Sequence, residues 1–287
     1  MSNVFKTTLL LTGMTLLLML AGRAFGGQRG MLMALAFAAV LNFVSYFFSD
    51  KIALATYRAQ PVGRDDLPRV YNIVERLAQK VSLPMPKVYL IPTDSPNAFA
   101  TGRNPNHASV AVTQGILGLL TDDELEGVLA HELGHVRNRD ILISSIAATL
   151  AGAITYLASI ARWGMIFGGM RGSRDDRDGG GIAAIAMMFL APFAAMLIQL
   201  AVSRSREYGA DDTGAHWTGN PYALASALAK IDAYSRQRPL VATPSTAHLF
   251  IIAPFLGAGS FGSLFSTHPP TAKRIERLTG RPAEFGQ

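Results

Sequence analysis

Four long apolar stretches alternate with polar segments along the 287-residue chain. A helix needs about 20 mostly apolar residues to cross the hydrocarbon core of a bilayer. Each stretch is about that long, and the last three contain no charged residue. The pattern therefore predicts a mainly α membrane protein with four transmembrane helices, at residues 4–22, 30–49, 141–161 and 181–203.

The first apolar stretch could instead be a cleaved signal peptide, because residues 21–24 loosely resemble a cleavage region. Its only charged residue is Lys6, close to the end of the stretch, where the long side chain can reach the aqueous interface. An equally apolar stretch follows at once. We therefore expect an uncleaved membrane anchor.

The four predicted helices pair into two hairpins, at residues 1–49 and 141–203, and leave two polar segments, 50–140 and 204–287. Because each hairpin crosses the membrane twice, both polar segments are expected on the same side. The second hairpin interrupts the polar part of the chain, so the helices on either side of it should leave the membrane close together.

A fifth apolar stretch, residues 249–265, also lacks charge, but it contains Pro254 and three glycines. A spanning helix must satisfy its own backbone hydrogen-bonding groups, and this density of helix-breaking residues argues against one. We expect a loop or a re-entrant segment close to the membrane.

Hydrophobic spacing within the polar segments predicts further helices and a small sheet. Apolar residues recur every three or four positions between 67 and 81, which is typical of an amphipathic helix. Val88 and Leu90 follow the alternation of a short strand. The expected elements are helices at 67–81, 221–235 and 270–278, strands at 87–91 and 108–112, and a turn or short helix at 114–120.

The formal charge of +6 and the pI near 9.7 would suit a nucleic-acid partner. No nucleic-acid-binding motif is present in the sequence, and lysine and arginine gather beside the apolar stretches, where they would meet anionic lipid headgroups. We therefore expect a lipid bilayer and no nucleic acid as partner. The chain contains no cysteine, which excludes disulfides.

His131, Glu132 and His135 form an H-E-x-x-H pattern inside a predicted helix. Residues four apart on a helix share one face, so both imidazoles can bind the same metal ion. Glu132 then serves as the general base that acts on the metal's water. Thr121, followed three residues later by Glu124, predicts a capping box where this helix begins. The alternative is a helix that carries two histidines by chance.

A catalytic zinc takes three protein ligands and a water molecule. Cysteine is absent, and position 141, where one class of zinc peptidase has its third histidine, is Ile. Glu207 and Asp211 lie four residues apart on another predicted helix. We predict Glu207 as the third ligand and Asp211 as the acceptor of a ligand histidine's spare ring N–H. Alone, an E-x-x-x-D pattern usually marks a solvated helix face.

Four blocks of the sequence together resemble the HtpX membrane metallopeptidases, which are relatives of the CAAX prenyl proteases. The blocks are residues 97–102, 131–135, 207–211 and 266–270, and the similarity extends over nearly the whole chain. The resemblance implies a zincin-like α+β catalytic domain beside the membrane helices, with one zinc ion per chain.

The same resemblance implies an endopeptidase of the bacterial cell inner membrane with its active site facing the cytoplasm. Its partners would be misfolded or damaged membrane proteins, cleaved in membrane quality control and in the stress response. The distribution of lysine and arginine beside the predicted spans favours a cytoplasmic site only narrowly. The family resemblance therefore decides the orientation more than the charges do.

The stretch Asn97, Ala98, Phe99, Ala100 and Thr101 lies between the two predicted strands. In metallopeptidases, the edge of a strand beside the metal binds extended substrate through backbone hydrogen bonds. We expect these five residues to form that edge. An ordinary hairpin is the alternative.

His268 begins an H-P-P block that the family resemblance marks as functional. It is our candidate for a second group, besides the metal, that stabilises the oxyanion of the transition state. The alternative is that Pro269 and Pro270 set the start of a helix and His268 only precedes it. Arg274, about a turn further on, is a weaker candidate for the same role.

Three other functions compete with this interpretation. A membrane scaffold with a structural zinc ion would not need a base such as Glu132. A metal transporter would need ionisable residues inside its spans, and the predicted spans have essentially none. Prenyl-protein processing is a narrower enzymatic alternative, which the sequence alone does not distinguish from general proteolysis.

Overall fold

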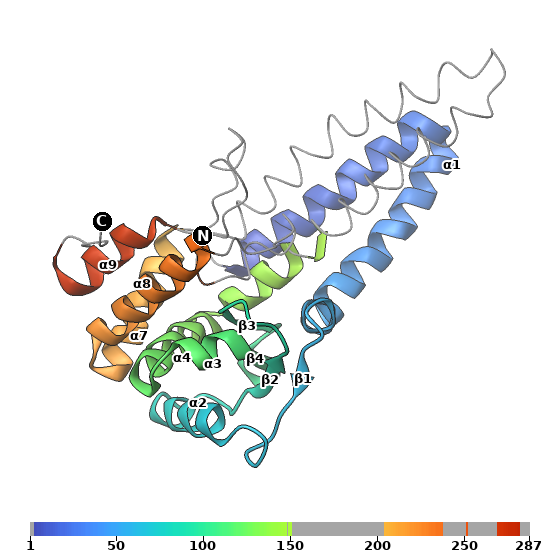
Figure 1. Cartoon of the computed structure of the whole chain (residues 1–287). Helices are drawn as coiled ribbons and strands as arrows, with labels where there is room; N and C mark the ends of the chain where they lie inside the picture. Colours follow the sequence, from blue (N-terminus) through green and yellow to red (C-terminus); the bar gives the residue numbers. More distant parts are fainter. Residues whose placement is uncertain (1–2, 148, 151–203, 238–250, 252–268, 282–287) are drawn as a thin grey trace.

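The computed structural model describes residues 3–147, 149–150, 204–237, 251 and 269–281 (Figure 1). Most of the second predicted hairpin, 141–203, and of the apolar stretch 249–265 lies outside these residues, as does His268. The predictions for those parts of the chain therefore stay predictions.

The first predicted hairpin folds as one long element, α1 (Asn3–Thr56), that doubles back on itself (Figure 1). The reversal occurs at Gly27, whose φ of 60° and ψ of −144° are non-helical and accessible to glycine. The two arms touch near the turn: a Cβ added to Gly22 would lie 2.4 Å from the backbone oxygen of Gly30. Further along, Nδ2 of Asn42 donates a hydrogen bond to Oγ1 of Thr15 at 2.9 Å.

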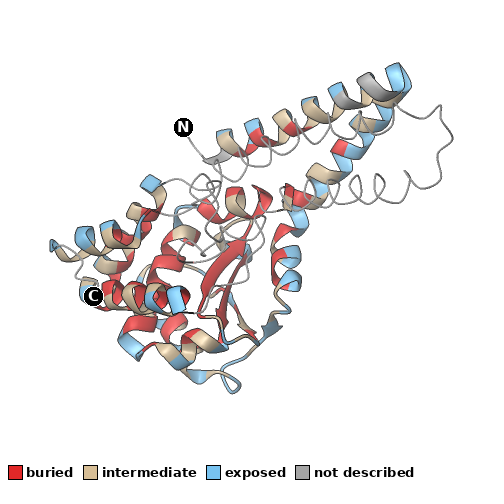
Figure 2. Ribbon diagram, turned by 45° about the horizontal axis from the view of Figure 1, so that its top comes forward, coloured by how far each residue is buried: buried red, intermediate tan, exposed pale blue. Residues whose placement is uncertain are grey.

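Many large apolar side chains of the α1 hairpin are exposed. Figure 2 shows exposed residues along both of its arms. Among the described residues, its second arm, Gly26–Thr56, is the one helix long and apolar enough to cross a membrane, with a mean hydropathy of 2.0. The first arm contains a shorter apolar helix, Phe5–Leu20. A soluble protein would bury such surface, whereas lipid tails can cover it.

A small mixed sheet lies at the base of this hairpin. Its strands are β1 (Gln60–Pro61), β2 (Lys87–Ile91), β3 (Ala98–Gly102) and β4 (Ala108–Thr113), in the order β1-β2-β4-β3. Strands β2 and β4 run parallel, and the other two pairs are antiparallel. The two strands predicted at 87–91 and 108–112 are present, and 97–101 contributes most of the edge strand β3.

The remaining described helices pack around this sheet and around one central helix, α4 (Asp122–Arg137). Contacts to α4 come from strand β3 and from helices on several sides (Figure 1). The other elements are α2 (Pro68–Lys80), the 3-10 turn η1 (Pro105–His107), α3 (Gln114–Leu119), α7 (Arg204–Thr218), α8 (Pro221–Gln237) and α9 (Thr271–Thr279). The helices predicted at 67–81, 221–235 and 270–278 agree with these bounds to within two residues.

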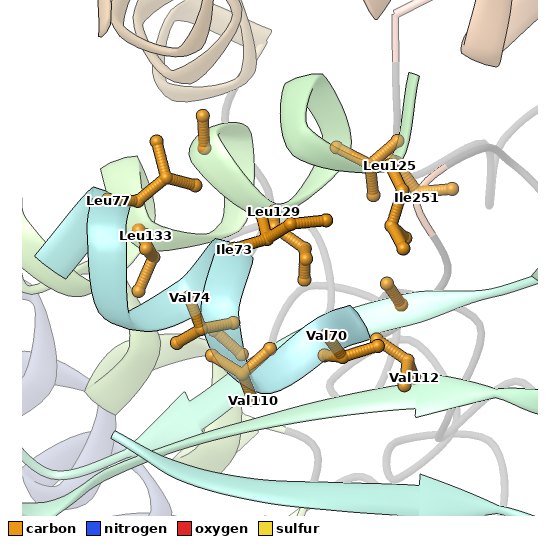
Figure 3. Packing of buried hydrophobic residues seen from close by; sticks show 14 of the residues in the cluster. Val70, Ile73, Val74, Leu77, Val110, Val112, Leu125, Leu129, Leu133 and Ile251 are labelled. Atoms are coloured by element: carbon orange, nitrogen blue, oxygen red, sulfur yellow. The ribbon is translucent and has the colours of Figure 1, made fainter. Parts of the chain in front are cut away.

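The main hydrophobic core lies between α2, α4 and the sheet (Figure 3). Val74 of α2, Val110 of β4 and Leu129 of α4 meet there, each with no exposed surface. Because α4 is surrounded, its polar residues His131 and Glu132 are buried in the interior of the protein.

The predicted capping box fixes where α4 begins. Oγ1 of Thr121 accepts a hydrogen bond from the backbone N–H of Glu124, and Oε2 of Glu124 accepts one from the backbone N–H of Thr121. Glu124 also receives hydrogen bonds from Ser226 and Lys230 of α8. These contacts stabilise the ionised form, and although burial opposes them, the pKa of Glu124 is lowered.

Candidate active site and metal centre

The two histidines of the H-E-x-x-H pattern lie one turn apart on α4, on the face that packs against α7. Their rings are nearly perpendicular, with centroids 4.8 Å apart. Helix α7 approaches closely at this point because Gly214 has no side chain: a Cβ there would lie 3.0 Å from the backbone nitrogen of His131. Gly134, on the same side of α4, faces Thr213 and Ala210 of α7. The small residues therefore allow α7 to bring its carboxylates to the histidines.

Glu207 of α7 lies between the two imidazoles, as the sequence predicted. Its Oε2 is 3.8 Å from Nε2 of His131, and its Oε1 is 3.5 Å from Nε2 of His135. One ligand atom from each of the three residues lies within 4.8 Å of the other two. The structure thus brings together all three predicted metal ligands.

Asp211, one turn beyond Glu207, approaches the other ring nitrogen of His131. The distance from Nδ1 of His131 to Oδ1 of Asp211 is 2.9 Å. Arg274 of α9 donates two hydrogen bonds to Asp211, at 2.7 and 2.8 Å, and a third to the backbone oxygen of Ile251. Burial opposes ionisation of Asp211, but the guanidinium of Arg274 outweighs it and lowers the pKa of Asp211 to about 2.

This arrangement corrects the interpretation of Arg274 as a candidate oxyanion stabiliser. Its side chain has no exposed surface, and all three of its nitrogens are engaged with Asp211 and Ile251. Burial favours the neutral form of Arg274, but the adjoining carboxylate prevails and raises its pKa. Arg274 therefore holds Asp211, and its side chain has no exposed surface in this structure.

Asp140, which no sequence pattern indicated, approaches the second histidine. Nδ1 of His135 is 3.2 Å from Oδ2 of Asp140, and Nε of Arg206 is 3.6 Å from the other oxygen of that carboxylate. Burial favours neutral imidazole, but Asp140 and the nearby carboxylates of Glu207 and Glu132 raise the pKa of His135 to about 9. Burial also lowers the pKa of Arg206. Asp140 lies five positions after His135, so helical periodicity gave no signal for this contact.

Glu132 is buried beside the sheet edge. One of its carboxylate oxygens, Oε2, accepts a hydrogen bond of 2.9 Å from the backbone N–H of Ala100 in β3. The edge strand thus contacts the predicted base directly.

The predicted substrate residues divide into two sets. Along an antiparallel strand, the backbone N–H and C=O groups of successive residues point alternately toward the paired strand and away from it. The hydrogen bond from the N–H of Thr113 to the backbone oxygen of Asn97 shows that Asn97 points toward β4, and the register then gives the direction of each residue of β3. Ala98 and Ala100 therefore direct their backbone groups away from β4, toward the side of β3 that pairs with no other strand among the described residues.

The side chains of the other three predicted substrate residues serve the fold. The side-chain amide of Asn97 is buried, and its oxygen Oδ1 accepts a hydrogen bond from the backbone N–H of Ile251. The ring of Phe99 packs against Tyr57 at the end of α1, with centroids 5.5 Å apart. Oγ1 of Thr101 lies 2.8 Å from Oγ of Ser145, in the helix that follows α4. All residues of β3 are buried in this structure, and the substrate role of this stretch stays a prediction that concerns its backbone.

The three clustered residues suit a divalent metal ion in chemistry as well as in position. Two imidazole nitrogens and one carboxylate oxygen converge, and each imidazole has a carboxylate at its remote nitrogen. That second contact is typical of metal-bound histidine, because it fixes the ring and its tautomer. The carboxylates around His135 also favour a positive charge at this point, as its raised pKa indicates.

Comparison with known proteins supports these features. The pattern of "Peptidase family M48" matches residues 65–282. A "Protease HtpX homolog" of Desulforapulum autotrophicum is 56% identical over 278 residues, which cover 97% of this chain and 90% of that protein. A protein with the same description from Pyrococcus furiosus is 54% identical and covers 98% of this chain and 96% of its own.

Among solved structures, the crystal structure of S. mikatae Ste24p resembles this fold with a TM-score of 0.54 at 20% identity. The match covers 93% of this chain and 63% of that one. At this identity the likeness concerns the fold alone. With the sequence similarity over nearly its whole length, the chain belongs to peptidase family M48, among its HtpX-type members, and is a membrane-associated metalloendopeptidase.

Proposed function

We propose that the protein is an integral-membrane zinc endopeptidase of the bacterial cell inner membrane, which cleaves misfolded or damaged membrane proteins at the cytoplasmic face. The observation that carries this proposal is the convergence of His131, His135 and Glu207 beside the buried carboxylate of Glu132. A quality-control role, with a part in the stress response, follows from the resemblance to the HtpX metallopeptidases.

Zinc is the metal that this set of ligands favours. Two histidines and one glutamate form a well-known catalytic zinc set, with the remaining position left to water. Oδ1 of Asp211 lies 2.9 Å from Nδ1 of His131 and can accept a hydrogen bond from the N–H there, which keeps the proton on Nδ1 and leaves Nε2 free to bind. When bound, zinc would lower the pKa of its water and polarise the scissile carbonyl.

Glu132 is proposed as the general base. The backbone N–H of Ala100 donates a hydrogen bond to Oε2 of Glu132, which leaves the other carboxylate oxygen, Oε1, to take the proton of the attacking water. The same carboxyl group then delivers a proton to the leaving amine. His268 remains our candidate for a group that stabilises the oxyanion, by its resemblance to the family's H-P-P block.

The outer edge of β3, on the side away from β4, is proposed to bind the substrate chain. The outward backbone groups of Ala98 and Ala100 can pair with an extended peptide, as strand addition requires. Because the N–H of Ala100 is held by Glu132, a substrate on this edge would pair with the carbonyl of Ala100 and with the backbone groups of Ala98. A peptide on this edge would pass directly beside the proposed base and metal ligands.

The position of β3 supports substrates at the membrane surface. Phe99 packs on Tyr57 at the end of the α1 hairpin, and the guanidinium of Arg103 lies 5.6 Å from the ring centre of Phe47. Aromatic and arginine side chains together are frequent where a protein enters the lipid headgroups. The scissile bond would therefore lie close to the point where substrate segments leave the bilayer.

The proposed activity is tested with purified, detergent-solubilised protein and an unfolded protein as substrate. Cleavage should stop when a chelator removes the metal and should return when zinc is added. Cleavage that is indifferent to the chelator would contradict the proposed metal centre. An inner-membrane substrate and a soluble one should be compared in the same assay, because preference for the former is part of the proposal.

The proposed topology is tested by single cysteines, since the chain contains none. Ser82→Cys and Lys273→Cys should both react with an impermeant thiol reagent from the cytoplasm. Gln28→Cys, at the turn of α1, should react from the opposite side; all three positions are exposed. Labelling of Ser82→Cys and Lys273→Cys from opposite sides would refute the arrangement of two hairpins.

A further inference from the structure

The two proposed histidine ligands have matching surroundings. Each directs Nε2 to Glu207 and Nδ1 to another carboxylate, Asp211 for His131 and Asp140 for His135. An imidazole that binds metal through Nε2 must carry its proton on Nδ1, where an acceptor fixes both the tautomer and the direction of the ring. The first pair was anticipated from the E-x-x-x-D pattern, whereas nothing in the sequence pattern pointed to the second.

We propose that Asp140 is a positioning residue for His135, and that Arg206 holds Asp140 in place. This inference rests on the proposed function, because it requires that His135 binds the metal. Asp140 itself contacts neither metal nor substrate in this arrangement. Its role is to set the orientation of the ring that does.

The chain makes a specific turn to deliver Asp140. In an uninterrupted helix, a residue five positions beyond His135 would lie roughly 140° around the axis and would face away from it. Helix α4 instead ends at Arg137, and Arg139 adopts the left-handed conformation with a φ of 57°. A new helix then begins at residue 140. The left-handed region is unfavourable for a residue with a side chain, so the fold maintains this turn against a local cost.

Arg206 connects this turn to the third proposed ligand. It immediately precedes Glu207 on α7, and its Nε is 3.6 Å from Oδ1 of Asp140. The side chains of Asp140 and Arg206 are 6% and 11% exposed, so each buried charge has an opposite charge close by. One turn of α7 therefore supplies both the ligand between the imidazoles and the cation beside Asp140. A shift of α7 would disturb both histidine contacts together.

The experiment compares metal binding by full-length wild-type protein and Asp140→Asn in detergent, with Co²⁺ as a spectroscopic probe. Asp140→Asn should bind Co²⁺ about 10–100-fold more weakly, the usual effect of removing such a partner. Its Co²⁺ absorption spectrum should also change, because the orientation of one imidazole is released. Asp140→Glu, which keeps the charge, should recover part of the affinity. That recovery distinguishes positioning from a general loss of packing.

The matched control is Glu124→Gln, at the other end of α4. Glu124 is also buried and also paired with a basic residue, Lys230, but it lies away from the histidines. Glu124→Gln should lower the thermal stability and leave both the Co²⁺ affinity and the spectrum unchanged.

Two results would overturn the inference. Folded Asp140→Asn with wild-type Co²⁺ affinity and spectrum would show that Asp140 does not orient His135. Wild-type protein that binds no Co²⁺ or Zn²⁺ would overturn the proposed function, and this inference with it. If Asp140→Asn does not fold, Asp140→Glu carries the test: an unchanged affinity and spectrum with the longer side chain would contradict the requirement for this geometry.

Discussion

Replacing Arg274 with methionine should strongly destabilise the protein and weaken its metal site. The substitution removes three hydrogen bonds and leaves the carboxylate of Asp211 buried without its cation. Breaking a buried ion pair from one side costs about 3–5 kcal/mol. For a chain of this size, each kcal/mol lowers the Tm by about 2–4 °C. We therefore expect the Tm to fall by roughly 6–20 °C, with about 10–100-fold weaker metal affinity as His131 loses its fixed partner.

Thermal unfolding followed by circular dichroism in detergent measures the first effect, and competition with a chromophoric chelator measures the second. Arg277→Met is the matched control on the same helix. Arg277 pairs with Asp212, and both side chains are 51% exposed. An exposed pair of this kind contributes little, so Arg277→Met should leave the Tm and the metal affinity unchanged.

One combination of kcat, Tm and metal affinity would refute this reasoning. If Arg274→Met loses kcat but keeps the wild-type Tm and metal affinity, Arg274 acts on the substrate, as the weaker sequence interpretation supposed. The double variant Arg274→Met with Asp211→Asn should be less destabilised than the sum of the single variants, because neither charge is then left alone.

Three further predictions follow from the contacts around the site. Ala98→Pro should raise KM, because pairing with substrate is lost. Ala100→Pro should lower kcat about 10–100-fold, because it removes a charge-assisted hydrogen bond to the proposed base that is worth about 1.5–3 kcal/mol. If each variant changed KM and kcat equally, the assignment would be contradicted. Gly214→Ala should lower the free energy of unfolding by about 1–3 kcal/mol and weaken metal binding, since the added Cβ would press on α4. In the same thermal-unfolding assay, Gly209→Ala should be neutral or stabilising by up to about 1 kcal/mol, because a Cβ at Gly209 would have no neighbour within 4 Å. The pKa of Asp211 is about 2 against an ordinary 3.8, so its ionisation should contribute about 2 kcal/mol to the free energy of unfolding above pH 4. This contribution should be lost as the pH falls toward 2. Tm measured against pH should show the loss in the wild type, and Asp211→Asn should not show this pH dependence.

Patterns that depend on neighbouring positions were sufficient to predict much of this site. The spacing of His131 and His135 placed both on one helix face, and the spacing of Glu207 and Asp211 did the same on a second helix. Thr121 and Glu124 form the predicted capping box. In each case the chemistry repeats with the period of the helix, so the sequence carries the geometry directly.

Contacts that depend on tertiary structure were not predictable in the same way. Asp140 reaches His135 only because Arg139 adopts a left-handed conformation, which residue type alone does not indicate. Arg274 is on the expected helix, but its direction depends on how α9 packs against α7. Nothing in the sequence pattern indicated that the side chain of Asn97 would accept a hydrogen bond from a distant part of the chain, the backbone N–H of Ile251.

The measurement that tests the central claim most directly is made on Glu132→Gln. Zinc content and cleavage of an unfolded protein are determined on the same purified sample, beside the wild type. The amide cannot take the proton of the attacking water, and the three proposed ligands are unchanged. We predict one zinc ion per chain and cleavage lower by a factor of about 10²–10⁴. Cleavage near the wild-type rate by zinc-loaded Glu132→Gln would contradict the assignment of the base and the mechanism built on it.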